Sequence, residues 1–182
     1  MAFHFSRASM LKESLPEFVE AARLCVTYIK DEDWEPMTHG GCLGFPACAL
    51  MFSVVDSIGS YHRGREDFRV LMDDQFVSIE KQSHHFYILN SQYYDLALPG
   101  RSISKLRQNY RDLLLHNAVI ADQHVMGIGN PEQEPFLEWR GRIHINVPAF
   151  LRVTERAVLK FLSVVDTVVP GSDQERVNAL KR

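Results

Sequence analysis

Hydrophobic residues recur at helical spacing in the first third of the chain. Ser14-Leu15-Pro16-Glu17 fits a capping box, in which the serine hydroxyl and the glutamate carboxylate bind the free amides of a first helical turn. The apolar positions that follow are Phe18, Ala21, Ala22, Cys25, Tyr28 and Ile29. A second segment, about Phe45 to Tyr61, is apolar on nearly every side and follows the glycine-rich run HGGCLGFP. This pattern predicts a buried central helix.

The middle of the chain predicts two further helices with an irregular stretch between them. We expect one helix over about Glu66 to Ser78, and another from Ser102 or Ser104 to about Ala121. Between them, HHFYILNSQYYDLALPG fits either short helical pieces or an extended connection, which Pro99-Gly100 ends. Its aromatic residues would either stack nucleic-acid bases or pack in the core, and we favour the core. They are Phe86, Tyr87, Tyr93 and Tyr94.

Strict alternation in RIHINV predicts a half-buried strand near the C-terminal end. Ile143, Ile145 and Val147 lie on its apolar side. The other side carries Arg142, His144 and Asn146, a row that would either face solvent or contact a ligand or partner. HVMGIG and FLEW are candidate partner strands, and Pro148 begins a last helix. The predicted fold class is therefore mainly α, a helical bundle with a small antiparallel β hairpin before the C-terminal helix. We expect one domain over residues 1–169 and a polar tail over residues 170–182.

Composition and charge exclude several classes of protein. The net charge of −3 gives no overall basic field for nucleic acid, so any such binding needs a local patch. Three cysteines without paired spacing favour a reducing compartment, and the N-terminus shows no signal-peptide pattern. The most apolar run is shorter than the roughly 20 residues of a membrane span. Asp56 interrupts this run, and a carboxylate there needs a hydrogen-bond or ion-pair partner. We expect a cytoplasmic protein with no membrane contact.

The segment NYRDLLLHN carries the most suggestive chemistry. On a helical wheel, one face is apolar and the opposite stripe holds Lys105, Asn109, Asp112 and His116. The apolar face consists of Ile103, Leu106, Tyr110, Leu113 and Leu114, with Asn117 beside them. Asp112 and His116 are neighbours at positions i and i+4, where the carboxylate would orient the imidazole. Such a pair is also common on an ordinary solvated helix face, and this reading stays open.

Four cations, Arg101, Lys105, Arg107 and Arg111, precede Asp112 and would form a positive strip. An arginine beside a histidine suits RNA cleavage, because the imidazole transfers a proton and the guanidinium stabilises charge on phosphorus.

Two other groups of residues are weaker candidates. His39 and Cys42 lie in a glycine-rich loop before a helix, where a thiol pKa can fall and the thiolate can act as a nucleophile, or where an anion can bind. No orienting third group is evident. His84 and His85 are adjacent and have no companion at metal-ligand spacing, so we expect no metal site there.

Arg111-Asp112-x-x-x-His116 resembles the Arg-polar-x-x-x-His signature of HEPN domains, the higher eukaryote and prokaryote nucleotide-binding family. The wider stretch from YYDLALPG to the last helix is similar to uncharacterised bacterial proteins in which the corresponding run reads more like YRNGLVH. The resemblance covers about the central two-thirds of the chain. The position after the arginine is usually Asn in the family and is Asp112 here.

The resemblance implies a helical, homodimeric, RNA-acting protein, in many members a metal-independent endoribonuclease of a toxin or defence system. It implies Arg111, Asp112 and His116 as catalytic residues, with Lys105, Arg107 and Asn109 as phosphate or RNA contacts. No cofactor or metal is implied, and an antitoxin-type protein is an expected partner. Two alternatives remain: a non-catalytic domain that binds a nucleotide or partner, and a structural helical domain.

Overall fold

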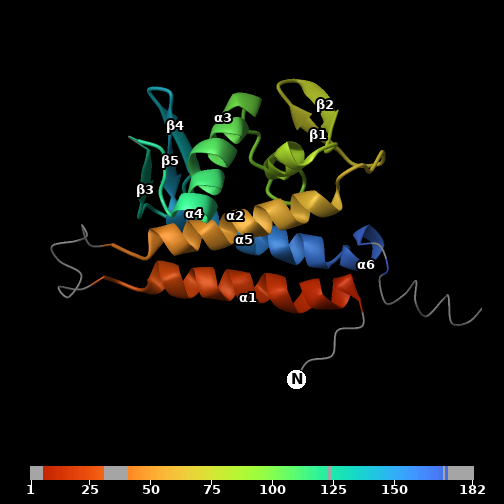
Figure 1. Cartoon of the computed structure of the whole chain (residues 1–182), viewed down its shortest axis with the longest axis horizontal. Coiled ribbons are helices and arrows are strands. Elements are labelled where there is room, and N and C mark those ends of the chain that lie inside the picture. The colour runs from red at the N-terminus through yellow and green to blue at the C-terminus, as the bar shows by residue number, and fades with distance from the viewer. Residues whose placement is uncertain (1–5, 31–40, 123, 170, 172–182) are drawn as a thin grey trace, which may run out of the picture.

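The helices and strands form two layers (Figure 1). The computed structural model describes residues 6–30, 41–122, 124–169 and 171. The first layer holds α1 (Arg7–Thr27), α2 (Gly44–Tyr61) and α5 (Val147–Leu162), which pack against one another, with α6 (Val165–Val168) at the end of α5. The second layer holds two small sheets and the helix with the NYRDLLLHN segment between them. The chain is thus mainly helical, as predicted, but it has one sheet more than expected.

α1 begins earlier than the sequence predicted. Its N-cap is Ser6, whose side chain accepts a hydrogen bond from the Ser9 amide at 3.1 Å, so the capping box at Ser14 is wrong and Pro16 lies inside the helix. The buried positions Leu11, Leu15 and Val19 continue the apolar stripe back through this first part. Of the predicted polar tail, only Gly171 lies within the described residues.

Aromatic rings join the two layers. Phe52 of α2 lies 5.0 Å from Phe150 of α5 and 5.6 Å from Phe86, measured between ring centroids. Phe86 belongs to the 3-10 helical segment η2 (Gln82–Asn90). The ring of Tyr110, in the second layer, lies 6.3 Å from that of Phe52. Phe86, Tyr93 and Tyr94 are buried, which confirms that this aromatic cluster serves the core, with Tyr87 partly exposed at its edge.

The helix predicted over Glu66–Ser78 is wrong. The segment instead forms an antiparallel hairpin of β1 (Arg69–Met72) and β2 (Gln75–Ser78). Asp73 and Asp74 connect the strands with φ angles of 45° and 64°. A two-residue hairpin turn with both φ values positive matches the strand twist, and aspartate accepts this conformation more readily than most residues.

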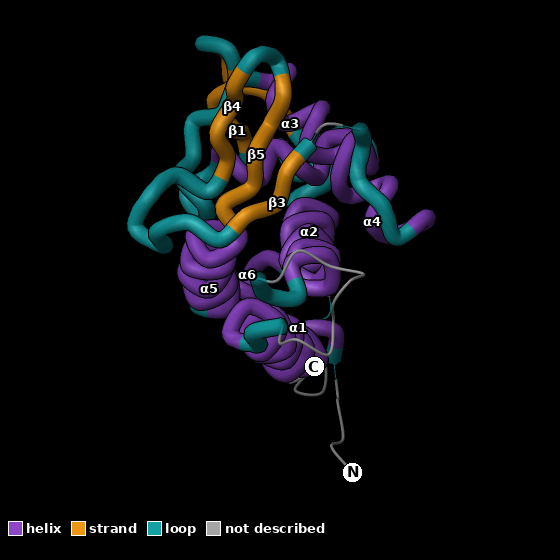
Figure 2. Tube along the Cα trace, turned by 90° about the vertical axis from the view of Figure 1, so that its left-hand side faces the viewer, coloured by secondary structure: helices purple, strands orange, loops and turns teal. Residues whose placement is uncertain are grey.

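The second sheet has three strands, in the order β3 (Val125–Gly127), β5 (Arg142–Asn146), β4 (Phe136–Trp139) (Figure 2). The β4–β5 hairpin is antiparallel, as predicted, but β3 pairs with β5 in parallel. The apolar row of β5 is buried as predicted. Asn146 departs from the expected exposed row, because its amide binds the backbone of Gly129 and Asn130 and is buried.

The helix that carries NYRDLLLHN runs from Gly100 to Asn117 and changes its winding on the way. It comprises α3 (Gly100–Lys105), a π-helical segment η3 (Leu106–Asp112) and α4 (Leu113–Asn117). π-helical turns are rare and are frequent at functional sites. The helix ends at Ala118, which adopts a left-handed φ of 56°, and therefore stops short of the predicted Ala121.

Candidate functional site

Arg111 is held by two carboxylates between η3 and α2. Its Nη2 donates to Oδ2 of Asp56 at 2.6 Å, and its Nη1 donates to Oδ1 of Asp112 at 2.9 Å. The Arg111 side chain is only 14% exposed. Burial lowers the pKa of Arg111, but Asp112 and Asp56 together outweigh burial and raise it above its ordinary value. The guanidinium is therefore a fixed positive charge in a defined place.

Asp56 has the partners that the sequence required. Besides Arg111, its Oδ1 lies 2.9 Å from Nδ1 of His85 on η2. The expectation of a structural hydrogen bond or ion pair for Asp56 is thereby confirmed. His85 is buried, and its Nε2 has no hydrogen-bond partner in the described part of the protein. One carboxylate thus ties α2, η2 and η3 together.

Asp112 contacts arginines on its own helix. Arg107 Nη2 lies 3.6 Å from Asp112 Oδ2, and Arg111 occupies Oδ1. Arg107 and Asp112 are five positions apart. In an α-helix two residues at this spacing point to different sides, but the π-helical winding brings these two side chains together. Asp112 therefore positions Arg111, and the expected orienting contact with His116 does not appear among the described interactions.

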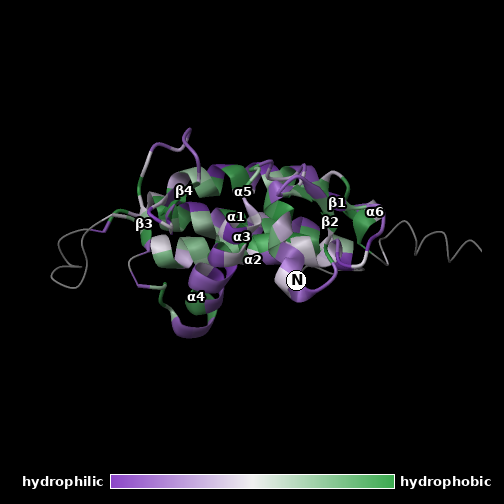
Figure 3. Cartoon of the chain, turned by 90° about the horizontal axis from the view of Figure 1, so that it is seen from above, coloured by the Kyte–Doolittle hydropathy of each residue, from purple (hydrophilic) through white to green (hydrophobic). Residues whose placement is uncertain are grey.

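His116 is exposed one residue before the C-terminal end of α4. Its side chain makes no hydrogen bond or ion pair within the described part of the chain. Of the three leucines before it, Leu114 is buried and Leu115 is 40% exposed. Figure 3 shows α4 projecting from the rest of the protein, with hydrophobic and hydrophilic residues side by side. The imidazole is free to meet a ligand or a second protein.

The other predicted RNA contacts are drawn toward the three-stranded sheet. Lys105 Nζ lies 3.2 Å from Glu138 Oε1 and donates to the carbonyl of Gly141 at 2.8 Å. Asn109 Nδ2 lies 3.1 Å from Nε2 of His124, a histidine that no sequence pattern marked as a site residue. The stripe predicted from the wheel is therefore divided: Lys105 and Asn109 contact the sheet side, whereas Asp112 contacts its neighbouring arginines.

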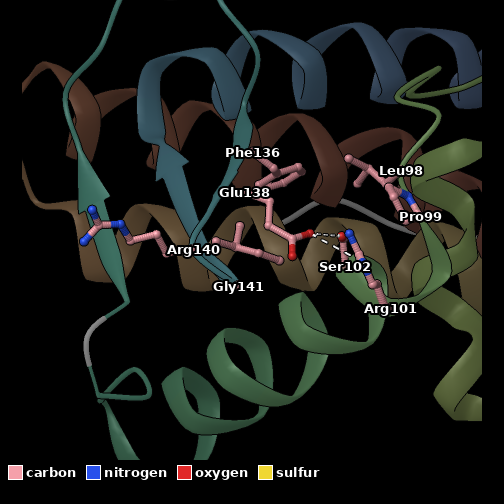
Figure 4. Close-up of a pocket in the computed structure, with 9 residues that line it drawn as sticks. Leu98, Pro99, Arg101, Ser102, Phe136, Glu138, Arg140 and Gly141 are labelled. Carbon is pink, nitrogen blue, oxygen red and sulfur yellow. Dashed lines mark hydrogen bonds and ion pairs between the residues drawn. The ribbon is translucent and has the colours of Figure 1, made fainter.

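A cavity of about 470 Å³ lies beside Glu138, between the start of α3 and the β4–β5 hairpin (Figure 4). Glu138 accepts a hydrogen bond from the buried Ser102 at 2.8 Å and lies 3.9 Å from Nε of Arg101. Ser102 and Lys105, followed by the charge of Arg101, lower the pKa of Glu138. The carboxylate consequently stays ionised and compensates the two nearest cations.

The predicted positive strip is therefore largely neutralised. Arg101 and Lys105 share Glu138, while Arg107 and Arg111 share Asp112, with Asp56 as a further acid. Asp56 and Glu138 lie far from the strip in the sequence, so local charge patterning could not reveal this compensation. The apolar surroundings of Asp56 were the one sequence signal for the network at Arg111.

The structure gives little support to a reactive thiol at Cys42 or to a ligand site at the His84–His85 pair. Burial raises the pKa of the Cys42 thiol despite nearby Lys30, which is the opposite of what a nucleophile needs, and His39 lies outside the described residues. His84 stacks on Tyr87 at 4.6 Å. Across the described residues, no three His, Cys, Asp or Glu side chains are grouped as metal ligands.

Comparison with protein-family models, with curated proteins and with solved structures found no match to this chain. Among the described helices, none combines the length and the apolar character that a bilayer-spanning segment requires.

Proposed function

We propose that the chain is a HEPN-like RNA-acting protein that cleaves RNA without a metal ion, with His116 as the proton-transfer group and Arg111 as the fixed cation. The observation that carries this proposal is the contrast on one helix between an immobilised Arg111, 14% exposed, and an exposed His116 that has no hydrogen-bond or ion-pair partner among the described residues. Proton transfer needs an imidazole that substrate can reach, and charge stabilisation needs a cation that does not have to reorganise.

The reaction would be an internal transfer at phosphorus. His116 would take the proton of the 2′-hydroxyl, the 2′ oxygen would attack the adjacent phosphorus, and the bond to the 5′ oxygen would break. The products are a 2′,3′-cyclic phosphate and a 5′-hydroxyl, whose proton would come from water or from His116 of a second copy. Asp112 and Asp56 would act as positioning residues for Arg111 rather than as proton carriers.

A homodimer is part of the proposal. Leu115 and Val119 are 40% and 47% exposed, and they flank His116 along the chain. Exposed apolar side chains around a polar group are typical of a protein interface. Pairing through this end of α4 would place two His116 rings near each other. An antitoxin-type protein is the other partner that such a surface would fit.

The test is incubation of purified protein with total RNA in EDTA, read on a denaturing gel. We expect cleavage by wild type and by Asn117→Ala, which alters the next exposed position, and none by His116→Ala at unchanged Tm. Fragments should end in a cyclic phosphate. Equal cleavage by His116→Ala would refute the assignment. A large fall in Tm for His116→Ala would instead indicate a structural role for the helix end.

A second candidate function is non-catalytic binding of RNA or a nucleotide. It is favoured by the two carboxylates on Arg111, which occupy both Nη atoms and so leave the guanidinium poorly placed to stabilise charge at a reacting phosphorus. In that case Arg107→Ala and Arg111→Ala would weaken affinity, and no variant or wild type would cleave RNA.

A further inference from the structure

We propose that the outward face of the β3–β5–β4 sheet binds single-stranded RNA, with a base stacked on Trp139 and the phosphates near Arg140 and Arg142. The proposal rests on the RNA-acting function above for the class of ligand. It assigns a second surface, away from Arg111 and Asp56, and it requires no cleavage.

Strand register defines the residues of this face. Val125 of β3 and Leu137 of β4 lie on either side of His144 of β5, and Trp139 pairs with Arg142 in the next outward row. The alternate residues of the strands point inward: Phe136, Ile143 and Ile145 are buried, Met126 packs partly buried against the core, and Glu138 is bound by Ser102 of α3. Trp139 is 55% exposed and Leu137 49% exposed. The part of the face around Trp139 and Leu137 is therefore open, whereas Asn146 and the Nε2 atom of His144 are buried.

The tryptophan ring is already arranged as a stacking surface. The guanidinium carbon of Arg140 lies 4.4 Å from the centroid of the Trp139 ring. His144 meets the same ring edge-on, with 6.1 Å between centroids. Proteins that bind single strands combine an aromatic platform for the bases with cations for the backbone, and arginine adds cation–π attraction. Trp139 and Arg140 supply these elements together, with His144 supporting the edge of the ring.

The charges of this face complement a polyanion. Its ionisable side chains are Arg140, Arg142 and His144. Glu138, which carries the only carboxylate in these three strands, points to the opposite face and is bound by Ser102 and Lys105. The basic field that the composition lacks overall is thus available locally, on a surface without an opposing carboxylate in the strands.

Arg140 occupies a backbone conformation that suits glycine better. Its φ is 50°, and Gly141 follows with 77°, so the two form the tight turn between β4 and β5. An arginine at such a position costs more than glycine, asparagine or aspartate would. Its guanidinium over Trp139 is a contact that none of those residues could provide. Arg140→Gly therefore removes the cation without straining the hairpin.

The experiment measures binding of a short fluorescein-labelled oligouridine by anisotropy in EDTA, in a His116→Ala, Trp34→Phe background. The sequence has two tryptophans, Trp34 and Trp139. This background removes the proposed turnover and makes Trp139 the source of the tryptophan emission. We expect saturable binding that quenches Trp139 emission.

Trp139→Ala should weaken binding about tenfold or more. Arg140→Gly should weaken it less and flatten its salt dependence. Phe76→Ala, which removes a 68% exposed aromatic from the other hairpin, is the matched control and should have no effect.

The inference is overturned if Trp139→Ala binds as tightly as the background protein, or if a perfect RNA duplex binds as well as the single strand. It is also overturned if Trp139→Ala changes only the oligomeric state, since the face would then be an interface between copies. Tight binding through Trp139 without cleavage by wild type would retain this inference and refute the nuclease. Cleavage that depends on His116, together with binding that Trp139→Ala leaves unchanged, would support the nuclease and refute this inference.

Discussion

Gly59 of α2 and His85 of η2 lie in direct backbone contact. A Cβ on Gly59 would lie 2.7 Å from the Cα of His85, closer than carbon atoms approach. Asp56 is three positions before Gly59 and so lies on the same face of α2. The absence of a side chain at Gly59 is what lets η2 come close enough for His85 to bind Asp56.

Gly59→Ala should therefore destabilise the protein by about 1–3 kcal/mol, because the backbone of η2 must move away from α2. Urea unfolding would measure the change. Gly127→Ala is the control, since a Cβ there meets no atom of the described residues within 4 Å, and it should have little effect. Similar losses for both variants would mean that the close approach is unimportant.

The Asp56–Arg111 ion pair should show strong coupling in a double-mutant cycle. Asp56→Asn and Arg111→Met each leave a partly buried charge without its partner, whereas the double variant removes both. We expect a coupling free energy of about 1–3 kcal/mol in the stabilising direction, from unfolding of the four proteins. A coupling near zero would show that the two residues are bound independently to Asp112 and His85.

Ala118→Gly should stabilise the fold by about 1 kcal/mol. Ala118 ends α4 with a φ of 56°, and its amide donates to the Leu114 carbonyl, a helix end that usually carries glycine. The measurement is a rise in Tm, and RNA cleavage should be retained because His116 is untouched. A fall in Tm would show that flexibility outweighs the relief of strain at this position.

His62 should make stability depend on acid pH. Its ring is buried, stacks on Phe68 at 3.8 Å between centroids, and neither nitrogen has a partner among the described residues. Burial, with a further contribution from Arg65, lowers the pKa of His62 from 6.5 to about 4. The unfolded chain thus binds a proton that the folded chain excludes, so stability is complete above pH 6.5 and falls as the pH drops toward 4.

The loss attributable to His62 is about 3 kcal/mol over this range. Thermal unfolding at several pH values would measure it. His62→Gln, which does not titrate, should show a smaller dependence on pH even if it is less stable at neutral pH. An equal dependence in wild type and variant would assign the effect to other groups.

Sequence patterns predicted those elements in which the spacing of apolar residues alone determines which face is buried. α2 and α5 each carry their own apolar positions, and β5 alternates, so their burial follows from spacing alone. The β1–β2 hairpin was missed because its turn uses Asp73 and Asp74 instead of a glycine pair. The parallel pairing of β3 was missed because nothing in a three-residue strand specifies direction.

The candidate site was predictable only in part, for a similar reason. Arg111, Asp112 and His116 stand together in the sequence, but the partners that decide their roles come from α2 and η2. Lys105 was expected to contact RNA and instead pairs with Glu138, which lies 33 positions away. A helical wheel also assumes uniform winding, and η3 does not have it.

The π-helical segment shifts the register of every residue that follows it along the helix. A turn closed by i→i+5 hydrogen bonds takes in one residue more than a turn of α-helix. A relative with an uninterrupted α-helix here would therefore align with a one-residue gap near Leu106–Asp112. The count of residues between Lys105, which lies before this winding, and Arg111, near its end, would then differ although their directions in space agree. A fixed spacing of charged residues in sequence therefore does not define the surface of this helix.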